Sequence, residues 1–375
     1  MPITKERNTE LLTNGRMMPA KSCLRRHYYE YELGIRRVQT SRPLRIGATI
    51  HAALDVWARG YGVDDIIEHI WSLAYIGPDG SDQKWQMETW IEAETCVALI
   101  LGYIAHWQQK GTIRKYISSE DKFDLPLINP LSSRQSRQWR IAGKIDKIAE
   151  LADGRTAIIE HKTTSDSIQP DSDYWKRLRL DQQISLYFMA AQAIYGHVDT
   201  IIYDVIRKPF LSPSQIPILD ENDCKVVTDQ AGNRVFNKNG APRQAASHAE
   251  GWSLSTRTET PDEYGKRLQS DINSRPEFYF ARQEIPRLDA DLDEFKLELW
   301  QQQKLISFCR ANGHWFRNTN ACVSPYKCPY FDICTNGIDL EEFIPEGFTR
   351  VGNIHPELED SNATPIATPN VAEIC

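Results

Sequence analysis

The sequence has 375 residues, of which 41% are hydrophobic and 10% aromatic, and this composition can bury a sizeable core in one large or two modest domains. The formal net charge of -7 excludes a global basic field that attracts nucleic acid, so any such binding requires local patches. The charged opening MPITKERNTE has no apolar segment behind it, and no stretch approaches the ~18 apolar residues of a membrane span. We therefore expect a globular, cytoplasmic protein that does not enter a membrane.

The N-terminal region, residues 1–115, is predicted to be helical. Apolar residues recur with helical spacing over 43–60, where Gly60 supplies a stop, and a second long helix is expected over 84–109. This region also contains a basic patch, which consists of Lys21, Arg25, Arg26, Arg36, Arg37, Arg42 and Arg45. Taken by itself, this patch is better explained as a solvated charged face.

Strand-like alternation marks the core, residues 116–210. Three stretches read SSEDKFDLPL, WRIAGKIDKIAEL and TAIIEHKTT, and a fourth, TIIYDVIRKP, ends at Pro209. Residues 174–195 are predicted to form one helix that Gly196 closes. This order of elements indicates an α/β fold with a mixed central sheet flanked by helices.

The rest of the chain divides into an insertion, a helical region and a tail. Residues 211–261 are polar, with a predicted hairpin in KVVTDQAGNRVF, and we expect an excursion from the core. Residues 262–349 form a C-terminal helical region, with a helical pattern around 292–310. Residues 350–375 are expected to be a flexible tail, and the stretch from Pro356 onward has no apolar periodicity.

A tight turn sets the register of the second and third strands. Asp153-Gly154 can close a hairpin with a three-residue loop, in which Gly154 takes the left-handed conformation. The closing pair is then Leu151 with Arg155. Counting outward from this pair, Asp146 falls directly opposite Glu160, with Cβ atoms ~5 Å apart on one face.

This pairing predicts a metal site. Two close carboxylates repel each other unless a cation lies between them, and Mg²⁺ or Mn²⁺ takes such oxygen ligands. Lys162 lies on the same face and can hold the attacking water. The alternative is a solvated face on which Lys162 is an ordinary ion-pair partner. Buried isoleucines around the charges favour the metal, since buried charge needs a partner: Ile145, Ile148, Ile158 and Ile159.

Three further residues can reach this site. Gln183 and Tyr187 lie four positions apart on a predicted helix, so both project from one face. His51 can serve as a neutral imidazole ligand. Taken alone, a tyrosine at helical spacing is more often a core residue, and a lone helical histidine more often makes a structural hydrogen bond.

In chain order, four motifs resemble the RecB-like branch of the PD-(D/E)XK nuclease superfamily. They are Gly47-xxx-His51, the GKID of 143–146, the EHK of 160–162 and Gln183-xxx-Tyr187. The resemblance covers residues 23–207 and resumes at the C-terminus, whereas the insertion lies outside it. It implies a restriction-endonuclease-like core. No proline precedes Asp146, a lack that members of this branch often share.

The resemblance also implies roles for these residues. The ligands of Mg²⁺ or Mn²⁺ would be His51, Asp146, Glu160 and the backbone carbonyl of His161. Lys162 would orient or activate the attacking water. Gln183 and Tyr187 would support the site and contact the DNA backbone.

The cysteines indicate a second metal centre. Disulfides are not expected in a cytoplasmic chain, and Cys322, Cys328 and Cys334 recur every six residues. Cys23 resembles the N-terminal cysteine that joins three C-terminal ones around a 4Fe-4S cluster in AddB-type helicase-nucleases and CRISPR-associated nucleases. Such a cluster would join the N- and C-terminal segments. Zinc remains the alternative, although the usual paired CxxC signature is missing.

Taken together, these features predict a metal-dependent DNA exonuclease that produces or trims single-stranded ends in recombination, repair or CRISPR-type processing. The alternative is a catalytically inactive iron–sulfur module that binds DNA and partners a helicase or recombination protein. The expected ligand is DNA, single-stranded or at strand ends. The protein partners left open are a recombination or annealing protein, a helicase and a CRISPR integrase.

Overall fold

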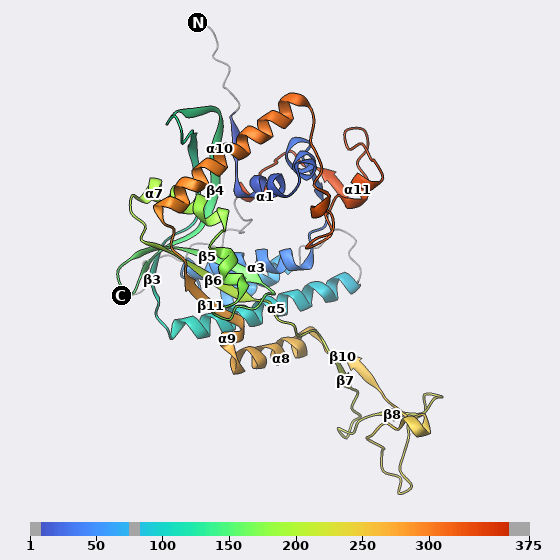
Figure 1. Cartoon of the computed structure of the whole chain (residues 1–375). Coiled ribbons are helices and arrows are strands. Elements are labelled where there is room, and N and C mark those ends of the chain that lie inside the picture. Colours follow the sequence, from blue (N-terminus) through green and yellow to red (C-terminus); the bar gives the residue numbers. More distant parts are fainter. Residues whose placement is uncertain (1–8, 75–82, 360–375) are drawn as a thin grey trace.

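The computed structural model describes residues 9–74 and 83–359, and a mixed six-stranded sheet lies at its centre (Figure 1). The strands are β1 (Glu10–Leu12), β3 (Ile113–Ile128), β4 (Gln135–Leu151), β5 (Thr156–Thr164), β6 (Thr200–Arg207) and β11 (Phe280–Glu284). Strands β1–β4 and β5–β6 pair in parallel, whereas β3–β4, β4–β5 and β6–β11 pair antiparallel. The predicted α/β class with a mixed central sheet is confirmed.

The predicted hairpin register is also confirmed. The Leu151 N–H donates to the Arg155 carbonyl over 2.8 Å, and Gly154 has the left-handed φ of 87° that the loop requires. The ladder then runs outward to the pair of Lys147 with Ile159. Asp146 and Glu160 are the next two residues in this register.

One edge of β4 stays open at this point. Strand β1 ends opposite Ile141, and the pairing with β5 begins only at Lys147. Because β3 pairs with residues 140–151 of β4, it must occupy the other edge. Residues 142–146 therefore have no described strand beside them on the β5 side, and β4 and β5 separate where the two carboxylates stand.

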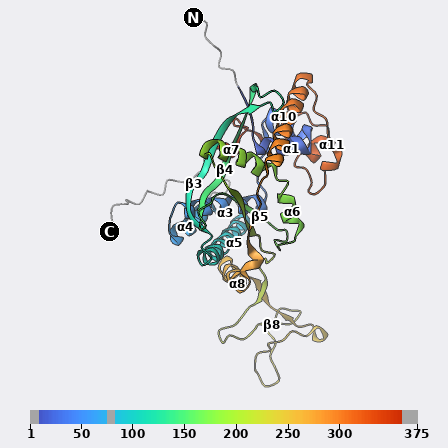
Figure 2. The same ribbon diagram turned by 60° about the vertical axis from the view of Figure 1, so that its left-hand side comes forward.

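Helices cover both faces of the sheet (Figures 1 and 2). One face carries α3 (Arg42–Ala58), α4 (Val63–Ala74), α5 (Gln83–Gln108) and α8 (Pro261–Ser274), which share a core with the β6 and β11 residues Ile206 and Phe280. The other face carries α7 (Gln182–Tyr195) and α10 (Asp289–Asn312), whose buried side chains meet Ile148, Ile158 and Ile201. The helices expected over 43–60, 84–109 and 292–310 are thus present, with ends shifted by a few residues.

The single helix predicted over 174–195 is wrong, because the chain forms two helices there, α6 (Asp173–Leu178) and α7. Asp181 ends the continuity, since its backbone is extended and its carboxylate accepts the Gln183 N–H over 2.9 Å. An aspartate in this position caps a new helix more favourably than it continues an old one.

The polar insertion forms an arm that projects from the body (Figures 1 and 2). Strands β7 (Gln215–Pro217) and β10 (Thr256–Thr258) pair antiparallel as its stem, and β8 (Val227–Thr228) pairs with β9 (Ser253–Leu254) farther out. The predicted turn is present, because Asp229 N–H donates to the Asn233 carbonyl over 2.9 Å. Gly232, with a φ of 83°, supplies its left-handed residue.

The N-terminal and C-terminal segments pack against each other. Their short elements are α1 (Asn14–Ser22), α2 (Leu24–His27), the π-helix Tyr28–Glu32, β2 (Ile35–Arg37), α11 (Phe331–Thr335) and β12 (Phe348–Arg350), whereas α9 (Pro276–Tyr279) lies against α5 and α8. Strand β12 pairs antiparallel with β2. Beyond this strand, the Val351 N–H donates to the Gly34 carbonyl over 2.8 Å and His355 is buried. Residues 350–359 therefore belong to the folded body, which corrects the expectation of a flexible tail from residue 350. Residues 360–375 lie outside the described part.

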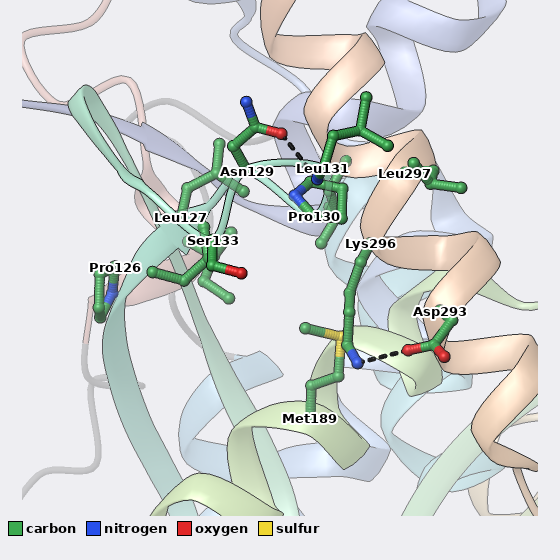
Figure 3. Close-up of a pocket in the computed structure, with 13 residues that line it drawn as sticks. Pro126, Leu127, Asn129, Pro130, Leu131, Ser133, Met189, Asp293, Lys296 and Leu297 are labelled. Carbon is green, nitrogen blue, oxygen red and sulfur yellow. Dashed lines mark hydrogen bonds and ion pairs between the residues drawn. The ribbon is translucent and has the colours of Figure 1, made fainter.

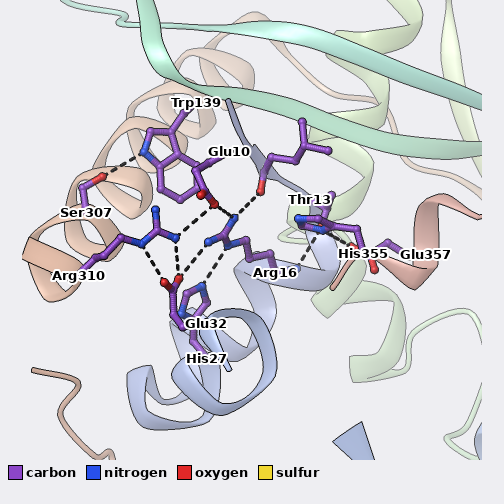
Figure 4. Close-up of polar contacts among 11 residues, drawn as sticks. Glu10, Thr13, Arg16, His27, Glu32, Trp139, Ser307, Arg310, His355 and Glu357 are labelled. Carbon is purple, nitrogen blue, oxygen red and sulfur yellow. Dashed lines mark hydrogen bonds and ion pairs between the residues drawn. The ribbon is translucent and has the colours of Figure 1, made fainter. Parts of the chain in front are cut away.

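A buried arginine ties these segments together (Figure 4). Arg16, with a fully buried side chain, pairs with Glu10 over 2.8 Å and with Glu32 over 3.1 Å. Arg310 of α10 binds Glu32 over 2.8 Å from the other side. Arg16 also lies 4.8 Å from the ring centroid of Trp139 in β4. These charge pairs join the first helix, the last long helix and the sheet.

In the part of the chain that the structure describes, no helix has the length and apolar character needed to span a membrane.

Candidate active site

The two predicted carboxylates lie together at the open edge of β4. Asp146 is 9% exposed and Glu160 is 1% exposed, so both are buried. Asp146 Oδ2 accepts a hydrogen bond from the His161 backbone N–H over 3.1 Å. This hydrogen bond to the Asp146 side chain takes the place of the next backbone hydrogen bond between β4 and β5, and it holds Asp146 against β5.

Lys162 stands beside this pair and is held from two sides. Its Nζ donates to Glu160 Oε1 over 2.7 Å and to Gln183 Oε1 over 2.6 Å. Gln183 in turn donates through Nε2 to the Tyr187 hydroxyl over 3.0 Å. The four side chains form one continuous chain of hydrogen bonds from β5 to α7. The structure therefore brings Gln183 and Tyr187 to the site.

Burial dominates the electrostatics of Glu160. Loss of hydration, together with the nearby Asp146 charge, raises the pKa of Glu160 to about 8, although Lys162 opposes this effect. Burial favours the neutral amine of Lys162, yet Glu160 and Asp181 outweigh it and raise the pKa of Lys162 above its usual value. Near neutral pH, Lys162 is a cation, whereas the Glu160 carboxyl group is mostly protonated.

The two histidines occupy different positions. His51 Nδ1 of α3 lies 3.5 Å from Asp146 Oδ2, and burial lowers the pKa of His51, which favours the neutral imidazole that metal ligands require. The His161 side chain points to the opposite sheet face, since alternate strand residues do so. There its Nε2 lies 3.5 Å from the Tyr103 hydroxyl and 3.6 Å from Asp204 Oδ2. Only the backbone of His161 is beside the carboxylates.

The donor set fits a hard divalent cation. No described residue gives a hydrogen bond to the buried Oε2 of Glu160, although Asp146 stands beside it. A buried carboxylate oxygen without a partner is costly, and a cation between the two carboxylates would remove this cost. Within residues 9–74 and 83–359, no three His, Cys, Asp or Glu side chains are already arranged as a metal-binding group.

Sequence reasoning missed two groups near the site. Asp181 Oδ2 lies 3.7 Å from Lys162 Nζ. Asp181 directly precedes an apolar helical pattern, and an aspartate in that place predicts a helix N-cap. Asp204 is fully buried and binds Arg282 Nε over 2.9 Å and the Tyr103 hydroxyl, beneath His161. No local sequence pattern could have predicted the contacts among Asp204, Arg282 and Tyr103, because these residues come from β6, β11 and α5.

The four cysteines proposed as cluster ligands lie in one corner of the molecule. Asn318 contacts two of them, since its N–H donates to Cys23 Sγ over 3.4 Å and its carbonyl accepts from Cys322 Sγ over 3.8 Å. The Cys328 N–H donates to the Cys322 carbonyl over 2.8 Å. Cys334 Sγ lies 3.7 Å from the Tyr29 hydroxyl. The fold gathers these segments, but their thiols are not a ready-made ligand group among the described residues.

An apolar cavity of about 580 Å³ lies elsewhere, between the β3–β4 hairpin tip, α7 and α10 (Figure 3). Leu131 and Pro130 line it from the tip, and Lys296 pairs with Asp293 at its α10 wall. None of its described lining residues belongs to the carboxylate site. Nothing about it indicates hydrolytic chemistry.

Comparison with known protein families agrees with the geometry. The sequence profile of the PD-(D/E)XK nuclease superfamily matches residues 16–335, which include both carboxylates, Lys162 and α7. No curated protein matches the chain.

Proposed function

Because the chain belongs to the PD-(D/E)XK nuclease superfamily, we propose that it is a Mg²⁺- or Mn²⁺-dependent DNA exonuclease. The observation that supports this best is the buried pair of Asp146 and Glu160 with Lys162 bound to Glu160, at the open edge of β4. The proposed ligands are these two carboxylates, the His51 imidazole and the His161 carbonyl. When bound, the cation would neutralise the carboxylates and polarise the scissile phosphate.

The protein's own groups would bind and orient the reactants. Since its pKa is raised, Lys162 remains an ammonium near neutral pH and cannot take a proton from water. It can instead donate a hydrogen bond to the attacking water or to a phosphate oxygen. Gln183 and Asp181 hold Lys162 in place. Tyr187 holds Gln183, so α7 sets the position of the ammonium.

The exonuclease mode rests on the order and spacing of the four motifs that this chain shares with RecB-like nucleases. On the same basis, we propose that the substrate is single-stranded DNA or a DNA end and that the setting is recombination, repair or CRISPR-type processing. A recombination or annealing protein, a helicase or a CRISPR integrase would be the partner.

Two substitutions test the chemistry. Glu160→Gln and Lys162→Gln should each lower the cleavage rate roughly 100-fold or more with either metal, because the first removes a charged ligand of the cation and the second removes the ammonium that orients the water or the phosphate. Lys266→Ala is the matched control, since Lys266 is exposed on α8 and pairs only at the surface with Asp262. Unchanged cleavage in Lys162→Gln would remove the catalytic assignment.

The substrate distinguishes the modes of action. End-labelled linear DNA should be degraded to short products while closed circular DNA of the same sequence stays intact. Cleavage of the circle would replace the exonuclease by an endonuclease. If the purified protein binds DNA but never cuts it with either metal, the inactive binding module is the better description.

We also propose that Cys23, Cys322, Cys328 and Cys334 hold a 4Fe-4S cluster. The support is their resemblance to the cluster motif and their approach in one corner, where four thiols suit iron–sulfur ligation or zinc. Anaerobically purified protein should contain iron and acid-labile sulfide, and Cys23→Ala should lose both. Full retention of iron in Cys23→Ala would exclude the four-ligand set, and stoichiometric zinc without iron would replace the cluster by a zinc site.

A further inference from the structure

A small cavity of about 270 Å³ lies beside α3 and α5, at the end of the sheet that carries the β4–β5 hairpin loop. It opens where α5 ends and β3 begins, and Ile113 in its wall pairs with Leu151 at the hairpin loop. Asp146 stands five positions farther along β4. The cavity and the carboxylate site are therefore separate places on one sheet.

Aromatic rings form the walls of this cavity. Trp57 of α3, Trp107 of α5 and Tyr116 of β3 all line it. The rings of Trp57 and Tyr116 meet edge to face at 6.1 Å, and the Arg282 guanidinium lies 3.9 Å from the Trp107 ring centroid. Because their neighbours fix these rings, and Arg282 already covers one face of Trp107, a planar ligand would meet ring edges and the remaining ring surface at little ordering cost.

The rim of the cavity carries excess positive charge. Arg114 and Lys115 both line it, and both pair with one carboxylate, Glu150, over 2.6 Å and 3.6 Å. Arg282 is matched separately by Asp204 over 2.7 Å. Arg114 and Lys115 thus share the single carboxylate of Glu150 at the mouth of the cavity. Among the described lining residues and their ion-pair partners, one positive charge is left over for a bound anion.

We propose that this cavity binds a nucleotide unit, with the base against Trp57, Trp107 and Tyr116 and the phosphate near Arg114 and Lys115. An aromatic wall beside a cationic rim is the combination by which proteins hold unpaired nucleotides. The volume is just below the range of sites for larger organic ligands, which suits one base and its phosphate. The unit belongs either to a free mononucleotide or to a DNA strand. The inference does not depend on cleavage at the carboxylates.

The test is calorimetric titration of the full chain with dAMP in EDTA, so that no cation recruits phosphate to the carboxylates. We expect dAMP to bind in a 1:1 ratio, and deoxyribose 5-phosphate, which lacks the base, to bind roughly tenfold more weakly or worse. Arg114→Ala/Lys115→Ala should weaken dAMP binding on the order of fivefold. It should leave the affinity for deoxyadenosine, which has no phosphate, unchanged. Lys266→Ala should match the wild type with both ligands.

The same titration distinguishes the two sources and can overturn the proposal. A short oligo-dA that binds more tightly than dAMP, and loses this advantage in Arg114→Ala/Lys115→Ala, identifies a strand as the ligand. Equal or weaker oligonucleotide binding identifies the free nucleotide. The proposal is wrong if dAMP shows no binding at millimolar concentration, or if the double variant binds dAMP like the wild type. Because Arg114 and Lys115 pair with Glu150 and not with Asp146 or Glu160, failure here would leave the proposed nuclease activity intact.

Discussion

The buried Glu160 predicts an unusual dependence of stability on pH in the metal-free protein. Its pKa is raised from 4.5 to about 8, chiefly by burial. A carboxyl group whose folded-state pKa lies above its unfolded value stabilises the fold while it is protonated. This stabilisation is complete below the unfolded value and is lost as the pH rises through about 8.

The magnitude follows from the same numbers. At 1.36 kcal/mol per pH unit, the gap between 4.5 and about 8 corresponds to ~5 kcal/mol in all, most of which is lost between roughly pH 5 and pH 8. The matched control is Glu160→Gln, which keeps the shape and cannot ionise. The free energy of unfolding of the wild type should therefore fall relative to that of Glu160→Gln across this range.

The assay is urea unfolding of both proteins in EDTA at several pH values. A constant difference between the two curves would refute the argument, since it would mean that Glu160 titrates normally in the folded protein. Saturating Mn²⁺ should reduce the decline, because a cation between Asp146 and Glu160 stabilises the ionised carboxylate.

Three further outcomes follow from the fold. Arg16→Ala should lower the free energy of unfolding by ~3–5 kcal/mol in urea, because it removes a fully buried side chain and leaves the half-buried Glu10 and Glu32 with Arg310 as their shared partner. Lys21→Ala, which breaks an exposed pair, should cost less than ~1 kcal/mol. Limited proteolysis without DNA should cut first within the arm, residues 211–261, and resistance there would show that the arm is packed against the body. Asp181→Ala should lower the free energy of unfolding by about 1 kcal/mol, because α7 loses its N-terminal cap. It should also slow DNA cleavage, because Lys162 loses a neighbouring carboxylate. Normal cleavage by this variant would show that Asp181 serves only as the helix cap.

Much of the candidate site was predictable from local sequence. The Asp-Gly turn fixes the register of β4 and β5, and the register places Asp146 opposite Glu160 without any tertiary information. Strand alternation puts Lys162 on the same face as Glu160, and helical spacing puts Gln183 and Tyr187 together. Each of these relations spans few residues, so chain geometry alone determines it.

Tertiary structure decided the rest. The open edge at Asp146 exists because β1, more than a hundred residues earlier in the chain, pairs with the same edge of β4 and stops at Ile141. The helix break at Asp181 depends on a competition between capping and continuation that periodicity does not reveal. Similarly, Arg16 reaches Arg310 through a shared carboxylate only after the two chain ends have met. Contacts between distant segments depend on how whole elements pack, and the local spacing of residues carries no record of that packing.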